Sequence, residues 1–493
     1  MRRAATPPYA VAAGLALLMA ASLLLRTGGL HSGYWIDEGI SVGIASHGLA
    51  DIPRALGQDG SPPLYYLLLH GWMALVGEGE AATRALSLIF ALLAVPVSFW
   101  AGTAVFGRRA GALAAVGAAG CPFLTYYAQE TRMYALVVLL SLLASASFVL
   151  AFVHARRAHV VLLGVWLTLL LYTHNWALFL AAGMGVAWIA QLRAGRVRAR
   201  DGLLLAAAVL ALYAPWVPTL VSQAAHTAAP WAERPSPLLL LAVPAGLFGY
   251  FALPLLAVAV LGAVRRGRVS DETVRVLVTI AAVAAVVAWL SSQAQPAWST
   301  RYLAVLLGPL LLALAATVAR GTRVTAIALV GVAAVWVISG AAPQKSNVRA
   351  VADEVKPVVR GGDLVVSTQP EQVPVLNRYL PEGVIYLTPL GVVFDPTMTD
   401  WRNGTARLRH GQASRRLEPM LSRLGPGRRI LLVTPVAGHH LSQAPWSRAV
   451  RIRTREWRRF LRHDPRLRPV GPAPTGSLPV RRNAVRAEVF EVR

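Results

Sequence analysis

Acidic residues, arginines and one histidine recur in the short polar segments that separate long apolar runs of this chain. They are Asp37, Glu38, Asp59, Glu130, Arg132, His174 and Arg301. A carboxylate can take the proton of a hydroxyl group as a general base. A guanidinium can hold a phosphate through paired, charge-assisted hydrogen bonds. Together these residue types suit the transfer of a group from a phosphate-bearing donor to a hydroxyl acceptor.

The composition indicates which kind of protein has to position these residues. The chain has 493 residues, of which 56% are hydrophobic and only 14% charged, yet its formal net charge is +25. Disordered chains combine high charge with low hydrophobicity, so disorder is excluded. A basic nucleic-acid binder fits poorly with so apolar a sequence. The single cysteine, Cys121, excludes an intrachain disulfide framework and a multi-cysteine metal site.

Apolar runs long enough to span a membrane fill the chain up to residue 341. The candidate spans are 8–27, 82–106, 110–127, 134–153, 158–173, 175–192, 202–221, 237–263, 274–292, 302–319 and 323–341. Because a spanning helix needs roughly 20 apolar residues, we expect a polytopic all-α membrane protein with about 11 transmembrane helices. A cleaved signal peptide is a second interpretation of the basic start and first run. The spans that follow favour an uncleaved first helix.

The charges around these runs predict the topology. Cytoplasmic loops carry an excess of arginine and lysine, and this asymmetry is greatest when the short run 62–77 is not counted as a span. We interpret 62–77 as a helix at the outer interface, within a long outer segment at 28–81. The N-terminus is then cytoplasmic in a cell-membrane protein, and the acidic residues, His174 and Arg301 share the outer side.

The tail, residues 342–493, differs from the apolar membrane domain, residues 1–341. It is polar, rich in arginine and punctuated by proline and glycine. Alternating helical and extended patterns predict an extracytoplasmic α/β domain. We expect helices at 347–360, 371–380, 406–424 and 448–463, and strands at 363–367, 384–387, 429–434 and 485–492. No glycine-rich phosphate loop is found, which leaves nucleotide binding without support.

Four segments, in order along the chain, resemble motifs of the GT-C membrane glycosyltransferases that use polyprenyl-phosphate sugars. Residues 35–38 (WIDE) resemble the family's Asp-Glu motif, and residues 59–66 (DGSPPLYY) its D-x-H-P-P-L-Y-Y segment. Residues 127–134 (YAQETRMY) resemble its S-Q-E-A-R-M-Y element, and 300–309 its late Arg-Tyr-to-Pro element. Similar proteins include protein mannosyltransferases, the aminoarabinose transferase of lipid A and rhizobial core transferases. One departure is Ser61, where many members have histidine.

The resemblance implies an acidic catalytic site. Asp37 would be the base that activates the acceptor hydroxyl, with direct displacement and inversion at the anomeric carbon. Glu38 and Glu130 would complete this site. No cofactor is required in members with monophosphate donors, although the three carboxylates could bind Mg²⁺ or Mn²⁺.

The resemblance also implies how substrates are bound. The donor phosphate would be held by Arg132, Arg301 and Tyr302. Further substrate-binding candidates are Asp59, Tyr65, Tyr134 and His174. The expected partners are a polyprenyl-phosphate-linked sugar donor, a hydroxyl acceptor on a glycan, lipid or protein, and membrane lipids, with no nucleic acid.

Simpler roles remain open for several of these residues. Asp37 could cap the helix that follows it, Asp59 before Ser-Pro-Pro is a natural turn residue, and Glu130 with Arg132 could form a solvated pair. On a helix Glu38 points about 100° away from Asp37, so the two carboxylates need not serve one atom.

Two other functions are alternatives. A multi-span transporter or flippase for a lipid-linked envelope precursor predicts ionisable residues at mid-membrane, whereas these spans are almost free of charge. A scaffold that works through the outer tail is the third hypothesis.

Overall fold

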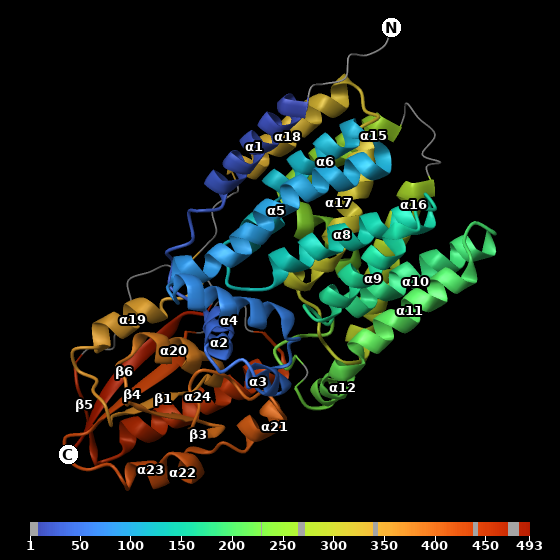
Figure 1. Cartoon of the computed structure of the whole chain (residues 1–493). Helices are drawn as coiled ribbons and strands as arrows, with labels where there is room; N and C mark the ends of the chain where they lie inside the picture. The colour runs from blue at the N-terminus through green and yellow to red at the C-terminus, as the bar shows by residue number, and fades with distance from the viewer. Residues whose placement is uncertain (1–7, 228, 265–271, 339–343, 437–441, 472–482) are drawn as a thin grey trace.

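A computed structural model describes residues 8–227, 229–264, 272–338, 344–436, 442–471 and 483–493. A long bundle of helices makes up the first two thirds of the molecule, and a smaller α/β domain is docked against one end of it (Figure 1). The predicted boundary at 341/342 lies outside the described residues. The expected fold class, a helical membrane protein with a C-terminal α/β domain, is confirmed.

Each predicted apolar run forms one helix or several consecutive ones. They are α1 (Pro8–Leu25), α5 (Glu80–Phe106), α6 (Arg108–Gly120), α7 (Pro122–Tyr127), α8 (Tyr134–Phe152), α9 (Ala158–Leu171), α10 (Ala177–Arg193), α11 (Ala199–Tyr213), η1 (Ala214–Trp216), α12 (Val217–His226), α13 (Leu238–Leu241), α14 (Val243–Phe248), η2 (Tyr250–Ala252), α15 (Leu253–Val264), α16 (Glu272–Ala294), η3 (Thr300–Leu303), α17 (Ala304–Val318) and α18 (Arg323–Ile338). In the described segments of the chain, five helical stretches are long and apolar enough to cross a membrane, and six more apolar helices are shorter. The multi-pass architecture is therefore confirmed, while the number of spans stays a prediction.

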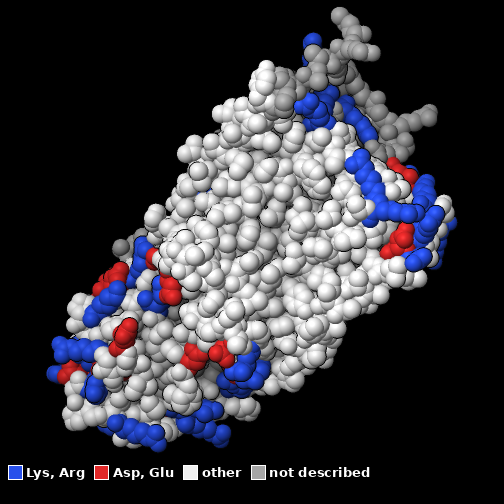
Figure 2. Space-filling model, viewed as in Figure 1, with Lys and Arg blue, Asp and Glu red and all other residues white. Residues whose placement is uncertain are grey.

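The surface of the bundle has the character expected of lipid contact. Figure 2 shows charged side chains at the two ends of the molecule and an almost uncharged belt between them. Inside the bundle, α8 is apolar on every side and 94% of it is buried, so it forms the centre. It packs against α5, α9 and α17. The loops at either end of these helices are thereby held in place.

Three helices form the long segment after α1. They are α2 (Ile36–Ala45), α3 (Ile52–Asp59) and α4 (Leu64–Val76). The helix predicted at 62–77 is α4, which packs against α2 and α5. In Figure 1, α2, α3 and α4 lie between the bundle and the α/β domain. This places the Asp-Glu segment at the junction of bundle and domain.

The C-terminal domain is a six-stranded sheet in the order β3-β2-β1-β4-β6-β5. The strands are β1 (Leu364–Ser367), β2 (Ile385–Thr388), β3 (Gly391–Val393), β4 (Arg429–Pro435), β5 (Leu467–Pro469) and β6 (Val485–Val492). The central strand β1 is parallel to both β2 and β4, and the other pairings are antiparallel. The four predicted strands are β1, β2, β4 and β6. The edge strands β3 and β5 were not predicted, because a strand of three residues is too short to show an alternating pattern of apolar and polar residues.

Helices cover both faces of this sheet. They are α19 (Val348–Val355), η4 (Pro370–Gln372), α20 (Val373–Tyr379), α21 (Gly404–Arg409), α22 (Ala413–Arg416), α23 (Glu418–Leu421) and α24 (Pro445–His463). The predicted helix 406–424 is therefore wrong as one element: three short helices occupy it. A break falls at Gly411, where an added Cβ would overlap the carbonyl oxygen of Pro389.

The bundle and the C-terminal domain dock through α2 and α20. A Cβ on Gly39 would lie 2.5 Å from the Val375 side chain, and a Cβ on Gly43 would overlap the carbonyl oxygen of Thr397. Glycine at these positions lets the backbones approach closely. The C-terminal domain therefore rests directly on the helix that carries Asp37.

Candidate active site

The first turn of α2 presents two neighbouring carboxylates in different directions. Trp35 precedes the helix in an extended conformation, and the side chain of Glu38 accepts a hydrogen bond from its backbone NH. Acidic side chains are favoured in a first helical turn by the partial positive charge there. Because successive residues turn by about 100°, Asp37 and Glu38 reach different partners.

Asp37 is paired with Arg301. The guanidinium Nη1 of Arg301 donates a 2.5 Å hydrogen bond to Oδ2 of Asp37, and each side chain is only 16% exposed. Arg301 comes from η3, directly before α17, and its guanidinium also faces the rings of Trp35 and Tyr302. A carboxylate and a guanidinium from two of the four motif segments thus meet at one point.

Arg132 also contacts the first turns of α2. Its Nη1 donates to the Ser41 hydroxyl at 2.8 Å, the Tyr66 hydroxyl at 3.2 Å and the carbonyl oxygen of Asp37 at 3.3 Å. These bonds join the loop between α7 and α8 to α2 and α4. The structure therefore brings Asp37, Arg132 and Arg301 together from three separate segments.

Several buried polar atoms around this cluster have no hydrogen-bond partner among the described residues. They are the Nε atoms of Arg132 and Arg301, the hydroxyl of Tyr134 and Oε2 of Glu130. A buried donor without an acceptor costs about 1–3 kcal/mol. Native proteins rarely leave such groups unsatisfied, and the two guanidinium Nε–H groups are donors that suit an anionic ligand.

Glu38 points away from this cluster into a buried ion pair with Arg84 of α5. The two hydrogen bonds are 2.7 Å and 2.6 Å, and the side chains are 1% and 3% exposed. Glu38 also accepts a 2.9 Å bond from the backbone NH of Thr131, next to Glu130 and Arg132. Its carboxylate therefore stabilises the loop that carries Glu130 and Arg132.

Glu130 is buried and forms an ion pair with Lys345. Lys345 comes from the segment between α18 and α19, at the entry to the C-terminal domain. Its ammonium lies 4.2 Å from the ring centroids of both Trp35 and Tyr126. Lys345 thus connects Glu130 with Trp35, the residue that also faces Arg301.

Asp59 and His174 lie in the same electrostatic neighbourhood. Burial raises the pKa of Asp59 to about 6, against the lowering effects of Arg132 and of a hydrogen bond with Ser61. Burial lowers the pKa of His174 to about 3, and the charges of Arg132 and Arg301 add to this effect. At neutral pH His174 is therefore uncharged and cannot act as a cation for a phosphate.

An aromatic wall lies beside the arginines. The ring of His174 is 4.9 Å from that of Tyr302 and 5.8 Å from that of Tyr134. The ring of Trp176 lies 5.4 Å from that of Tyr302, with the two planes tilted. Tyr65 is more remote: its hydroxyl bonds Ser87, whose hydroxyl donates to the carbonyl oxygen of Arg132. Tyr65 therefore supports the loop instead of facing the cluster.

Three residues near the cluster were not singled out from the sequence. Arg84 and Lys345 are the partners of Glu38 and Glu130, and only the rarity of lysine, with two in the chain, could have drawn attention to Lys345. The third is Glu371 of η4 in the C-terminal domain. Burial raises its pKa, hydrogen bonds from Gln369 and Trp446 oppose this, and the charge of Asp37 adds to the rise. No sequence signal joins η4 to α2.

The three carboxylates expected to bind a metal ion are not grouped around one point. Among the described residues, no three His, Cys, Asp or Glu side chains are grouped as a metal site. The carboxylates expected to bind Mg²⁺ or Mn²⁺ each have a cation of their own: Asp37 has Arg301, Glu38 has Arg84 and Glu130 has Lys345. These residues as arranged do not fit a shared divalent ion.

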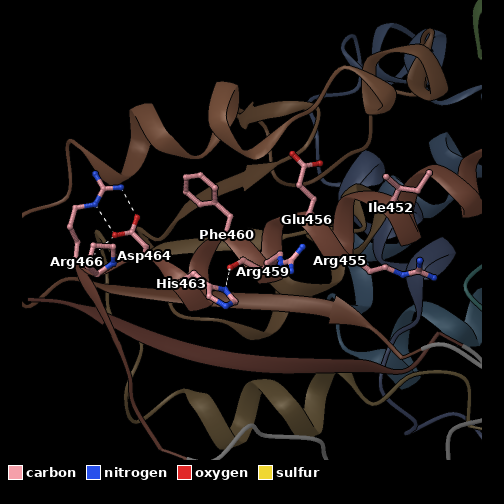
Figure 3. A pocket seen from close by; sticks show the side chains of 9 residues that line it. Ile452, Arg455, Glu456, Arg459, Phe460, His463, Asp464 and Arg466 are labelled. Atoms are coloured by element: carbon pink, nitrogen blue, oxygen red, sulfur yellow. Dashed lines mark hydrogen bonds and ion pairs between the residues drawn. The ribbon is translucent and has the colours of Figure 1, made fainter.

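A separate pocket lies on the C-terminal domain. It has a volume of about 1020 Å³ and is lined chiefly by one side of α24, with Arg455, Arg459 and Phe460 among its residues (Figure 3). Arg466 there is turned back onto Asp464 in an ion pair. None of the residues predicted from the motifs lines this pocket, so it is distinct from the Asp37 cluster.

The fold and the site together define a helical membrane protein with a carboxylate–arginine centre at one end of its bundle. No protein-family model matches the sequence, and no curated protein is significantly similar to it. Solved structures do match. ArnT from Cupriavidus metallidurans, in its structure bound to undecaprenyl phosphate, aligns over 98% of both chains with a TM-score of 0.59 and 13% identity.

Two more matches support the same fold. The apo oligosaccharyltransferase of Archaeoglobus fulgidus has a TM-score of 0.53 and 13% identity, over 87% of this chain and 70% of that one. The mycobacterial arabinofuranosyltransferase AftD has a TM-score of 0.54 and 16% identity, over 99% of this chain and 40% of AftD. All three belong to the GT-C superfamily. The chain therefore has the GT-C fold, as its motifs predicted.

Proposed function

We propose that this protein is a membrane glycosyltransferase that moves a sugar from a polyprenyl-phosphate donor to a hydroxyl acceptor at the outer face of the cell membrane. The observation that carries the proposal is the Asp37–Arg301 pair, with Arg132 beside it, in a GT-C fold. The neighbour ArnT, which was solved with undecaprenyl phosphate, supports a lipid-linked donor. The N-terminus is then cytoplasmic, and the C-terminal domain is extracytoplasmic.

In the proposed reaction Asp37 accepts the proton of the acceptor hydroxyl as general base. The acceptor oxygen bonds to the anomeric carbon while the bond from that carbon to the phosphate oxygen breaks, with inversion. Polyprenyl phosphate leaves with the electron pair, and its added negative charge is stabilised by Arg301 and Arg132. No step passes through a metal.

The ion pair between Asp37 and Arg301 has a place in this mechanism. An incoming phosphate offers Arg301 a second anion, so donor binding draws the guanidinium away from Asp37. The carboxylate is then free to accept a proton only when the donor is present. Tyr302, Tyr134 and neutral His174 form an aromatic wall suited to pack against the apolar face of a sugar or the first isoprene units.

The test is transfer by Asp37→Asn with a panel of polyprenyl-phosphate sugars and membrane extracts, with products identified by mass spectrometry. We expect no product from Asp37→Asn, while insertion and the thermal unfolding midpoint remain those of wild type. Asp51→Asn is the matched control, since Asp51 belongs to the same outer segment but pairs with exposed Arg54. Full activity of Asp37→Asn would remove the proposed mechanism, and wild type without transfer to any acceptor would remove the proposed function.

A further inference from the structure

Lys345 is placed in the cluster by the segment that leads into the C-terminal domain. Its ammonium lies between the rings of Trp35 and Tyr126 and forms an ion pair with Glu130, and its side chain is 17% exposed. Ordering a lysine side chain forfeits about 2 kcal/mol of rotamer entropy. Trp35, Tyr126 and Glu130 therefore hold this cation at a defined point.

The point is adjacent to the proposed reacting groups. The Trp35 ring that Lys345 contacts at 4.2 Å also lies 5.9 Å from the guanidinium carbon of Arg301. Arg301 in turn pairs with Asp37. The ammonium and the guanidinium therefore flank the same indole at the start of α2.

The balance of carboxylates and cations in the cluster indicates a role for the Lys345 ammonium. Without Lys345, the three carboxylates named from the motifs, Asp37, Asp59 and Glu130, outnumber the guanidiniums Arg132 and Arg301, and these five groups sum to one negative unit. Like charges repel more strongly in a partly buried site than in water. A donor phosphate would then enter a negative site. Lys345 brings the sum of these groups to zero before the phosphate arrives.

We propose that Lys345 is a ligand of the donor phosphate, and that its ammonium moves from Glu130 to the phosphate when the donor binds. Lysine suits this exchange because it is a compact charge on a flexible stem, and Trp35 and Tyr126 stabilise it in either position by cation–π contact. The segment that enters the C-terminal domain is thereby included in the donor site. This inference rests on the proposed function.

The experiment compares binding of a polyprenyl phosphate and of the polyprenol with the same chain to the purified full-length protein in detergent. The polyprenol lacks only the phosphate. We expect Lys345→Met to weaken binding of the phosphate by about tenfold or more, the loss of one charge-assisted bond, and to leave polyprenol binding unchanged. Lys345→Arg should retain most of the affinity. Lys356→Met is the matched control, because Lys356 is the other lysine and pairs with exposed Asp353.

A second variant distinguishes loss of a phosphate ligand from misfolding. Glu130→Gln removes the competing anion, so we expect it to bind the phosphate more tightly than wild type, an effect that misfolding cannot imitate. Equal phosphate affinity of Lys345→Met and wild type, or no gain in Glu130→Gln, would overturn the assignment of Lys345 while leaving the proposed function intact. If wild type itself does not prefer the phosphate to the polyprenol, the proposed function fails as well.

Discussion

The role of Glu38, structural or chemical, can be tested by replacing both Glu38 and Arg84 with methionine. The pair is almost fully buried and is joined by two short hydrogen bonds. Arg84 also donates to four carbonyl oxygens in the segment before α2, those of Gly29, Leu30, Ser32 and Gly33. If Glu38 has only a structural role, a well-packed apolar pair at residues 38 and 84 should keep Asp37 in place, and no carboxylate is needed at residue 38.

The expected magnitudes follow from burial. Removing one partner of a buried ion pair leaves an uncompensated charge and costs about 3–5 kcal/mol. We expect this loss in Glu38→Met and in Arg84→Met. The double variant buries no unpaired charge and should be more stable than either single variant, although the four carbonyl oxygens each lose a hydrogen bond of about 1 kcal/mol.

Activity should follow the same pattern. A shift of about 1 Å in a reacting group can lower a rate by about 100-fold, so each single variant should lose about that much kcat/KM. The double variant should recover to within about tenfold of wild type. The assays are thermal unfolding in detergent and sugar transfer. The control is Arg54→Met, which breaks an exposed pair with Asp51 and should cost about 0–1 kcal/mol.

One result would refute this reasoning. A double variant that regains stability but transfers no sugar would mean that the carboxylate of Glu38 takes part in the chemistry. Its burial against Arg84 would then describe only a resting state.

Three more predictions concern the site and the docked domain. Because burial raises the pKa of Asp59 to about 6, its protonation adds one positive unit to the site, so phosphate-lipid affinity should rise as pH falls through 6 and should not do so in Asp59→Asn. Burial opposes the charged forms of His47 and Asp395, but their 2.8 Å hydrogen bond raises the pKa of His47 and lowers that of Asp395. The pair stabilises most between pH 3.8 and 6.5 and weakens as pH rises through the raised pKa of His47, so His47→Ala should lower the unfolding midpoint at pH 5.5 more than at pH 8.5. Gly43→Val should loosen docking of the C-terminal domain on α2, which limited proteolysis would detect as faster release of that domain, with Gly71→Val as a control in open space.

Much of the fold could be predicted because the signals are local. An apolar run must become a helix to satisfy its backbone in lipid, and helices occupy every predicted run from α1 to α18. The strands β1, β2, β4 and β6 are apolar enough to be recognised one by one. The helix predicted at 406–424 failed because the close approach of Gly411 to Pro389 is a long-range contact that no local pattern records.

The site was predicted as a set of residues but not as a set of pairs. Motif order and the shared side of the membrane indicated that Asp37, Arg132 and Arg301 would meet. Asp37 and Glu38 are neighbours with the same chemistry, yet one pairs with Arg301 and the other with Arg84.

The sequence by itself determined the class of fold, the order of the motifs and the residues that gather at one end of the bundle, because hydrophobic length and residue type act locally. Only the tertiary structure decided which carboxylate pairs with which cation, and that Lys345 reaches Glu130 across more than two hundred residues of chain. The physical reason is that an ion pair depends on distance and burial, and these are set when helices distant in sequence pack together.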